Sequence, residues 1–142
     1  MVVETPMVTI RAVQPTDMEA CLRLLYAMQQ ETHWAQYAPP SAEDLVWFLA
    51  GLPYLVVAVD GEEIIGICGG SLQRHACFPS VPYVLEEVLY VTPSWRHGNV
   101  GNELLNGLRT WGWEQGAQAL VVGRPTQNGE TIRWYRRKGS HV

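Results

Sequence analysis

The fold is decided by one stretch of the chain, Val88-Leu89-Tyr90-Val91-Thr92-Pro93-Ser94-Trp95-Arg96-His97-Gly98-Asn99-Val100-Gly101, and by the amphipathic segment at 102–115 that follows it. The pattern predicts a strand, a tight loop and then a helix. Glycine and asparagine accept unusual backbone dihedrals, so consecutive loop amides can turn toward one point at the helix N-terminus. Free amides and the positive end of the helix dipole favour an anion there. The stretch therefore predicts a binding site for a phosphate-bearing cofactor.

The spacing of this loop distinguishes it from two common phosphate loops. The chain has neither Gly-x-x-x-x-Gly-Lys-Ser/Thr nor Gly-x-Gly-x-x-Gly after its first strand. The loop instead resembles the acetyl-coenzyme A loop of the GCN5-related N-acetyltransferase (GNAT) family, whose signature Gln/Arg-x-x-Gly-x-Gly/Ala begins here at Arg96 and ends at Gly101. Asn99 replaces the middle glycine, and asparagine can also adopt a left-handed conformation. An ordinary strand-to-helix turn is the alternative interpretation of so short a signature.

Length and charge limit the class of protein. The 142 residues, 47% of them hydrophobic, can bury one core and are too few for two ordinary domains, so we expect a single domain over 1–142. A net charge of −4 argues against broad electrostatic attraction to nucleic acid. A local basic cluster is interpreted either as a solvated helix end or as a contact for cofactor phosphates; it comprises Arg133, Arg136, Arg137 and Lys138.

The cysteines and the hydropathy pattern bear on location. Cys21, Cys68 and Cys77 are odd in number and lack metal-ligand spacing, so we expect neither a disulfide framework nor a metal site. A catalytic cysteine would need a histidine, and His75 beside Cys77 is the only local candidate. The sequence shows no signal-peptide pattern and no run approaching the roughly 20 apolar residues of a membrane span. We therefore expect a cytoplasmic protein that does not bind a membrane.

Hydrophobic periodicity predicts the order strand, two helices, three strands, helix, strand, helix. The expected strands cover 8–13, 54–59, 64–72, 83–91 and 117–122, and the expected helices cover 15–32, 41–50, 102–115 and 128–138. Asp60-Gly61-Glu62 is a hairpin signal between the second and third strands. The last strand follows a strand and a helix, so we expect it to be parallel to its neighbour through a right-handed crossover. The class is α/β, with a mixed sheet flanked by helices.

A second motif extends the resemblance to nearly the whole chain. The segment Asn128-Gly129-Glu130-Thr131-Ile132-Arg133-Trp134-Tyr135-Arg136-Arg137-Lys138-Gly139 resembles the GNAT pattern Asn-x-x-Ala-x-x-Phe-Tyr-x-x-x-Gly. Thr131 and Trp134 stand where the family usually has alanine and phenylalanine. Both motifs occur in the family's order and on the expected elements. The resemblance therefore implies a GNAT-like mixed central sheet flanked by helices.

The C-terminal end departs from the family pattern. The family continues past the final glycine into two more strands, whereas this sequence ends at Val142. The resemblance implies a sheet that lacks the usual C-terminal β-hairpin, which would leave the strand at 117–122 as an exposed edge. We expect either a partner on that edge, for which we favour a homodimer, or a shorter sheet with a more open acceptor cleft.

The resemblance implies acetyl transfer from acetyl-CoA directly to an amine, with no metal. Such a reaction requires the amine to lose a proton, the thiolate to gain one, and the oxyanion to be held. The resemblance implies that the pantetheine arm pairs with the backbone of Leu89 and Val91 like an added strand. It assigns the pyrophosphate to the loop residues Arg96, His97, Gly98, Asn99, Val100, Gly101 and Asn102.

Three further residues are given roles. Tyr135 occupies the family's position for the residue that protonates the leaving sulfur, although it is also interpreted as a core tyrosine. Asn128 would contact the cofactor arm or cap the last helix. Strand alternation places Glu87 on the face of Leu89 and Glu86 on the other, so Glu87 is predicted to be the base, acting through water. A solvated or substrate-orienting carboxylate is the alternative role for Glu87.

The acceptor side is less defined by the sequence. In the family it is shaped by the loop between the first two helices, which here carries His33, Trp34 and Tyr37. His33, Trp34 and Tyr37 would form an aromatic wall suited to a cationic or aromatic amine, or they simply pack together. His75 is a second candidate for the base on the acceptor side, and its alternative is an exposed histidine without a role.

Two other functions remain open. A GNAT-like module that binds coenzyme A or a protein partner without efficient turnover is favoured by Asn99 and by the expected absence of the hairpin. Retention of Glu87, Asn128 and Tyr135 favours an enzyme. A nucleotide-binding protein of another family would bind ATP or a dinucleotide instead of coenzyme A.

Overall fold

The structure is a computed structural model that describes residues 8–122. Within these residues the strands are β1 (Val8–Ala12), β2 (Tyr54–Asp60), β3 (Glu63–Arg74), β4 (Pro82–Val91) and β5 (Ala119–Val122). The helices are α1 (Met18–Gln30), α2 (Ala42–Ala50) and α3 (Val100–Glu114), with short 3-10 helices η1 (Pro15–Asp17), η2 (His33–Gln36) and η3 (Pro93–Trp95). The expected helix at 128–138 lies outside the described residues.

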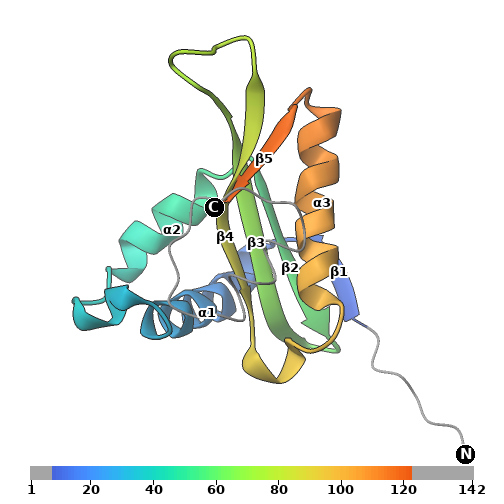
Figure 1. The fold of residues 1–142 in the computed structure, drawn as a ribbon. Coiled ribbons are helices and arrows are strands. Elements are labelled where there is room, and N and C mark those ends of the chain that lie inside the picture. Colours follow the sequence, from blue (N-terminus) through green and yellow to red (C-terminus); the bar gives the residue numbers. More distant parts are fainter. Residues whose placement is uncertain (1–7, 123–142) are drawn as a thin grey trace, which may run out of the picture.

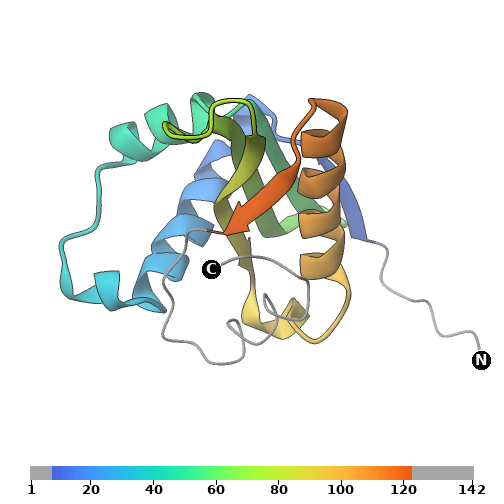
Figure 2. The same cartoon turned by 45° about the horizontal axis from the view of Figure 1, so that its top comes forward.

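The strands form one mixed sheet in the order β1-β2-β3-β4-β5. The first four strands pair antiparallel, and β5 pairs parallel to β4. Helices α1 and α2 lie on one side of the sheet and α3 lies on the other, as the two orientations in Figure 1 and Figure 2 show. The α/β class, the mixed sheet and the parallel final strand are thereby confirmed for the described residues.

Local signals in the sequence explain where several elements begin and end. Gly61 has a φ of 62° in the turn between β2 and β3, a left-handed conformation that favours glycine. The Ser41 hydroxyl accepts a hydrogen bond from the Asp44 amide (3.1 Å) and caps α2. Gly116, with a φ of 92°, ends α3. The Ala117 amide still bonds the Gly112 carbonyl at 2.9 Å, so β5 begins two residues later than predicted.

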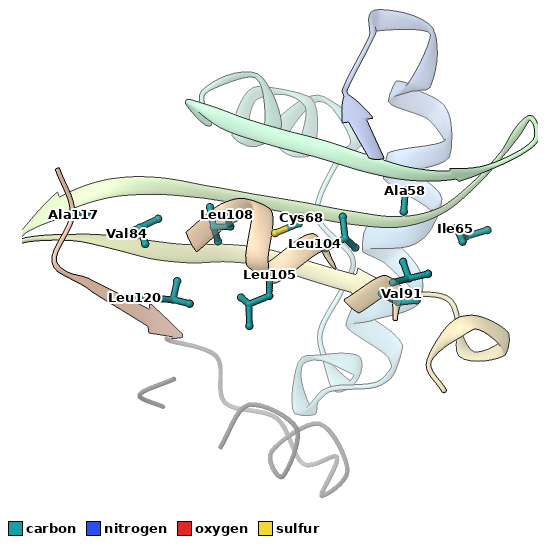
Figure 3. Packing of buried hydrophobic residues seen from close by; sticks show 11 residues of the cluster. Ala58, Ile65, Cys68, Val84, Val91, Leu104, Leu105, Leu108, Ala117 and Leu120 are labelled. Carbon is teal, nitrogen blue, oxygen red and sulfur yellow. The ribbon is translucent and has the colours of Figure 1, made fainter. Parts of the chain in front are cut away.

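Two apolar clusters fill the space on the two sides of the sheet. Figure 3 shows the cluster under α3, where the helix directs Leu104, Leu105 and Leu108 against the strands. The cluster on the other side joins α1 and α2 to the same strands through residues such as Cys21, Leu25, Leu49, Ile67 and Val88. The side chains of β3 and β4 are therefore buried on both faces, which fixes the central pair of strands. In residues 8–122 no helix is both long and apolar enough to cross a membrane.

Candidate active site

Within residues 8–122, strand β4 is paired on both sides over only part of its length. Its parallel pairing with β5 runs from Tyr83 opposite Ala119 to Glu86 opposite Val122. The pairing of β4 with β3 continues much further, to Val91. In the described part of the chain, the edge of β4 beyond Glu86 therefore has no partner from β5.

The backbone groups of Leu89 and Val91 point toward this open edge. The Thr92 amide donates to the Ile65 carbonyl at 2.9 Å, which makes these two residues a hydrogen-bonded pair of the β3–β4 ladder. In an antiparallel ladder, hydrogen-bonded and non-hydrogen-bonded pairs alternate. Val91, opposite Gly66, and Leu89, opposite Cys68, are therefore non-hydrogen-bonded pairs whose N–H and C=O groups face away from β3. The geometry suits the predicted use of this edge as a template for an extended ligand.

The predicted phosphate loop lies directly after this edge. It leads from η3 to the first turn of α3, which contains Val100 and Gly101. The helix has no carbonyl four residues before these two, so their backbone amides have no hydrogen-bond acceptor within the helix. The side chain of the N-cap residue Asn99 does not cap the helix. The open edge of β4 and the N-terminus of α3 are thus adjacent and joined by the short segment 92–99.

The loop reaches this geometry without left-handed residues. Asn99 has φ −93° and ψ 0°, and in residues 8–122 the positive φ values occur only at Gly61 and Gly116. The unusual dihedrals expected for the loop are therefore absent, because η3 and α3 meet through ordinary backbone conformations. The substitution of asparagine for the family's middle glycine creates no backbone strain here.

Arg96 is held by partners within the chain. Its Nη1 and Nη2 donate to the two carboxylate oxygens of Glu31 at 2.6 and 2.7 Å, and its Nε donates to the Val91 carbonyl at 2.8 Å. The guanidinium also lies 5.1 Å from the centre of the Tyr90 ring. The hydrogen bonds from Arg96 lower the pKa of Glu31. Arg96 sits at the start of the loop as predicted, but its guanidinium faces Glu31 and the strand end; its contact with a cofactor stays a prediction.

A β-bulge shifts the side chains of β4 relative to those of β3. Gly69 and Gly70 are consecutive on β3, but their partners on β4 are Val88 and Glu86. Glu87 is therefore an extra residue on β4. From this point toward the start of β4, the alternation of side chains between the two faces is displaced by one residue.

The displacement brings Glu86 to the α3 side of the sheet. Residues directly opposite each other in antiparallel strands share a face, and a Cβ on Gly70, the partner of Glu86, would lie 2.6 Å from Leu108 Cδ1 of α3. Glu86 is only 2% exposed. The pKa of the Cys68 thiol is raised first by the burial of Cys68 and second by the charge of Glu86. The expectation that Glu86 faces away from Leu89 is wrong, because the extra residue breaks the alternation on which it was based.

Glu87 remains half-buried next to Glu86, whose pairing with Val122 is the last described pair of β4 with β5. The role of Glu87 as a base stays a prediction. Glu86 is a second carboxylate at the same place, and strand alternation assigned its side chain to the wrong face of the sheet. The signal that could have found it is the pair Gly69-Gly70, since adjacent glycines inside a strand often mark a bulge or a close approach.

The aromatic residues predicted for the acceptor side come together. Trp34 and Tyr37 have ring centres 5.6 Å apart, and both side chains are about half exposed (52% and 56%). The end of α1 holds them, because Gln29 Nε2 donates to the carbonyls of Trp34 (3.0 Å) and Tyr37 (3.3 Å). The Thr32 hydroxyl accepts from the Trp34 amide, which explains why a predicted loop forms the 3-10 helix η2.

The structure does not bring His75 to this region. His75 follows β3 at the hairpin with β4, whereas the phosphate loop follows the other end of β4, as Figure 1 shows. The eight residue steps from Tyr83 to Val91 span about 26 Å at the usual rise of a strand. The imidazole Nδ1 accepts the Cys77 backbone amide at 3.0 Å, and its ring packs near Phe78. A role for His75 at the acceptor site stays a prediction.

The predicted roles of Asn128 and Tyr135, and the basic cluster beside them, lie outside the described residues. Within residues 8–122, no group of three or more His, Cys, Asp or Glu side chains could hold a metal ion. Among the described cysteines, Cys21 and Cys68 are buried as free thiols and Cys77 is exposed.

A model of the acetyltransferase (GNAT) family matches residues 20–139. The chain belongs to this family. The match spans both sequence motifs as well as the bulged strand and the loop described above. Among curated proteins, none matches the sequence significantly.

Solved structures similar to this GNAT chain share its fold at low sequence identity. The aminoglycoside N-acetyltransferase AAC(6')-Iy in complex with CoA has a TM-score of 0.77 and 19% identity, over 100% of this chain and 93% of that chain. The same enzyme with the bisubstrate analogue CoA-S-monomethyl-acetylneamine gives 0.73 and 19%, over 96% and 92% of the two chains. A transcriptional regulator from Bacillus halodurans C-125 gives 0.77 and 19%, over 96% and 94%. At such identity these likenesses establish the fold and leave the acceptor open.

Proposed function

We propose that this chain transfers the acetyl group of acetyl-CoA directly to an amine. The observation that carries the proposal is the outward-facing backbone of Leu89 and Val91, placed immediately before the N-terminus of α3 in a member of the GNAT family. The extended pantetheine arm would add to β4 as a short strand, and the pyrophosphate would meet the loop amides of 97–102. The structure of AAC(6')-Iy contains bound CoA, and this supports acetyl-CoA as the acetyl donor.

The transfer needs one base and one acid at the parted strands. The amine nitrogen attacks the thioester carbonyl carbon, the bond from this carbon to sulfur breaks, and the proton of the amine passes through water to a carboxylate. We assign this carboxylate to Glu87, which is half-buried, in preference to the fully buried Glu86. The departing thiolate takes the proton of the Tyr135 phenol. Asn128 is proposed to hold the cofactor arm.

The acceptor is proposed to be a cationic or aromatic amine that contacts the exposed rings of Trp34 and Tyr37. A cation over an aromatic face gains about 0.5–2 kcal/mol, depending on how far it is desolvated. The bisubstrate analogue bound to AAC(6')-Iy shows an amine-bearing acceptor on this fold, so aminoglycosides belong in the first panel of acceptors to be screened.

The first experiment is calorimetric titration of the purified chain with acetyl-CoA, with ATP and NAD as controls. Selective binding of acetyl-CoA with a micromolar or tighter dissociation constant is expected, and Gly101→Trp should abolish it by filling the loop. A folded chain that binds none of the three ligands would refute the proposal. Binding of ATP or NAD in place of acetyl-CoA would assign the loop to another class of nucleotide.

A second candidate, a GNAT-like module that recognises coenzyme A or a protein partner without efficient turnover, is favoured by one observation. The guanidinium of Arg96 already has its three donor nitrogens engaged, by Glu31 and Val91, which leaves it poorly placed to grip a phosphate. Acetyl-CoA binding without release of free thiol in the presence of any amine of the panel would favour this candidate over the enzyme.

A further inference from the structure

The last turn of α1 contacts both sides of the proposed site. On one side, Gln29 holds the backbone of the aromatic segment 33–37, and Thr32 caps it. On the other side, Glu31, the C-cap residue of α1, binds Arg96 at the start of the phosphate loop. These contacts all come from residues 29–32 at one helix end, so a movement of this end would displace both loops together.

The pair between Glu31 and Arg96 has the geometry of a strong ion pair. Both guanidinium Nη atoms meet both carboxylate oxygens at 2.6 and 2.7 Å, which is the bidentate arrangement that fixes the plane of an arginine. The two side chains are only 34% and 30% exposed. By contrast, Glu19 and Arg23 on the same helix are 3.7 Å apart and almost fully exposed, at 90% and 69%. An exposed pair of that kind contributes little.

The guanidinium also contacts the end of β4. Its Nε donates to the Val91 carbonyl at 2.8 Å, and its Cζ atom lies 5.1 Å from the centre of the Tyr90 ring. Val91 is one of the two residues whose backbone faces the proposed pantetheine path. Burial, followed by the neighbouring Glu31, raises the pKa of Tyr90 to about 12, so the phenol stays neutral and adds no charge to the pair.

We propose that Glu31 is a positioning residue of the acetyl-transfer site, which holds Arg96 so that the phosphate loop and the edge of β4 keep the geometry that binds coenzyme A. This inference rests on the proposed function. It assigns the recognition of the pyrophosphate to the loop amides and gives Arg96 a holding role. If Arg96 instead grips the pyrophosphate directly, it must first leave Glu31, and Glu31 then acts as a competitor of the cofactor.

These two roles predict opposite effects of Glu31→Gln on the dissociation constant for acetyl-CoA. The amide keeps the size of the side chain but has one acceptor oxygen and no charge, so Arg96 loses its fixed plane. A positioning role predicts a dissociation constant about five- to twentyfold higher, within the usual range of coupling between sites. Competition predicts tighter binding. An unchanged or lower dissociation constant for Glu31→Gln overturns the inference.

The experiment is calorimetric titration of the full chain and its variants with acetyl-CoA at a temperature where thermal unfolding shows each to be folded. Glu19→Gln, which removes the same charge from the exposed pair on α1, is the matched control and should bind like the wild type. Arg96→Gln and the double variant complete a cycle. Because Glu31 acts through Arg96, adding Glu31→Gln to Arg96→Gln should raise the dissociation constant for acetyl-CoA by less than a further twofold. Fully additive effects of the two substitutions on the binding free energy contradict the inference.

Amide hydrogen exchange of the unliganded chain provides a readout that does not need the cofactor. Exchange of the amides at 96–102 should be faster in Glu31→Gln than in Glu19→Gln. Equal exchange in the two variants contradicts the holding role. If the wild type itself binds no acetyl-CoA, the proposed function fails and the positioning role fails with it. If the wild type binds and Glu31→Gln binds equally well, only the positioning role is refuted.

Discussion

Replacing Gly70 by alanine tests the packing that places Glu86 and α3. A Cβ at this position would lie 2.6 Å from Leu108 Cδ1, 3.2 Å from Leu108 Cδ2 and 2.7 Å from the Leu85 carbonyl oxygen. Leu108 is fully buried and cannot swing into solvent, and the carbonyl belongs to the backbone of β4. The methyl group therefore fits only if α3 moves away from the sheet or the bulged strand shifts.

The expected cost follows from these contacts. Overpacking a core by one methyl group costs about 1–3 kcal/mol, and the lower chain entropy of alanine in the unfolded state returns about 0.4–1 kcal/mol. We expect the free energy of unfolding to fall by about 1–2 kcal/mol. With an unfolding entropy of about 2.1 cal/mol/K per residue, the melting temperature of a 142-residue chain should fall by about 3–7 °C.

Urea and thermal unfolding of Gly70→Ala, compared with Gly51→Ala, measure this cost. Gly51 has a helical backbone (φ −84°, ψ −7°), and a Cβ there would meet only carbonyl oxygens at 3.5 and 3.6 Å. Gly51→Ala should therefore be neutral or slightly stabilising. If Gly70→Ala is as stable as Gly51→Ala, Leu108 does not lie against Gly70, and the argument that Glu86 faces α3 fails with it.

Three further variants test other contacts. Asp17→Asn should lower the free energy of unfolding at pH 7 by about 1–3 kcal/mol, because Arg11 donates to both Asp17 oxygens at 2.6 and 3.0 Å. Those bonds lower the pKa of Asp17, so in urea unfolding the difference should shrink as the pH falls through the usual value of 3.8 and vanish below the lowered pKa. Glu87→Gln should lower kcat about 100-fold, as expected for loss of a base, whereas Glu86→Gln should keep kcat within tenfold; the reverse order in steady-state kinetics would make Glu86 the base. Gln29→Ala should raise the KM for the acceptor about threefold with an unchanged dissociation constant for acetyl-CoA, and a weaker acetyl-CoA complex would contradict its assignment to the acceptor side.

The parts of the fold that depend on local chemistry could be predicted from the sequence. The turn at Gly61, the cap at Ser41 and the end of α3 at Gly116 each follow from the properties of one or two residues. The parallel order of β4 and β5 follows from the helix between them. The clustering of Trp34 with Tyr37 also agrees with their spacing in one short segment.

The parts that depend on tertiary pairing could not be predicted. The bulge at Glu87 is a property of the register between two strands, and alternation along one strand cannot reveal it. The partner of Arg96 lies 65 residues away on α1, and no local pattern connects the two. The sequence therefore predicts the strand and the loop of the candidate site, but it misassigns the face of Glu86 and leaves the holder of Arg96 unidentified.

The bulge lies directly beside the last described pair of the parallel ladder, and it shapes this part of the candidate site. Within residues 8–122, that last pair is Glu86 with Val122, and the extra residue Glu87 follows at once. A bulge increases the local twist of a strand, so the direction of β4 changes beside Glu87. A strand without the extra residue would keep its alternation and place Glu86 on the opposite face, away from α3. The one extra residue therefore accounts for the two neighbouring carboxylates, Glu86 on the α3 face and Glu87 at the bulge.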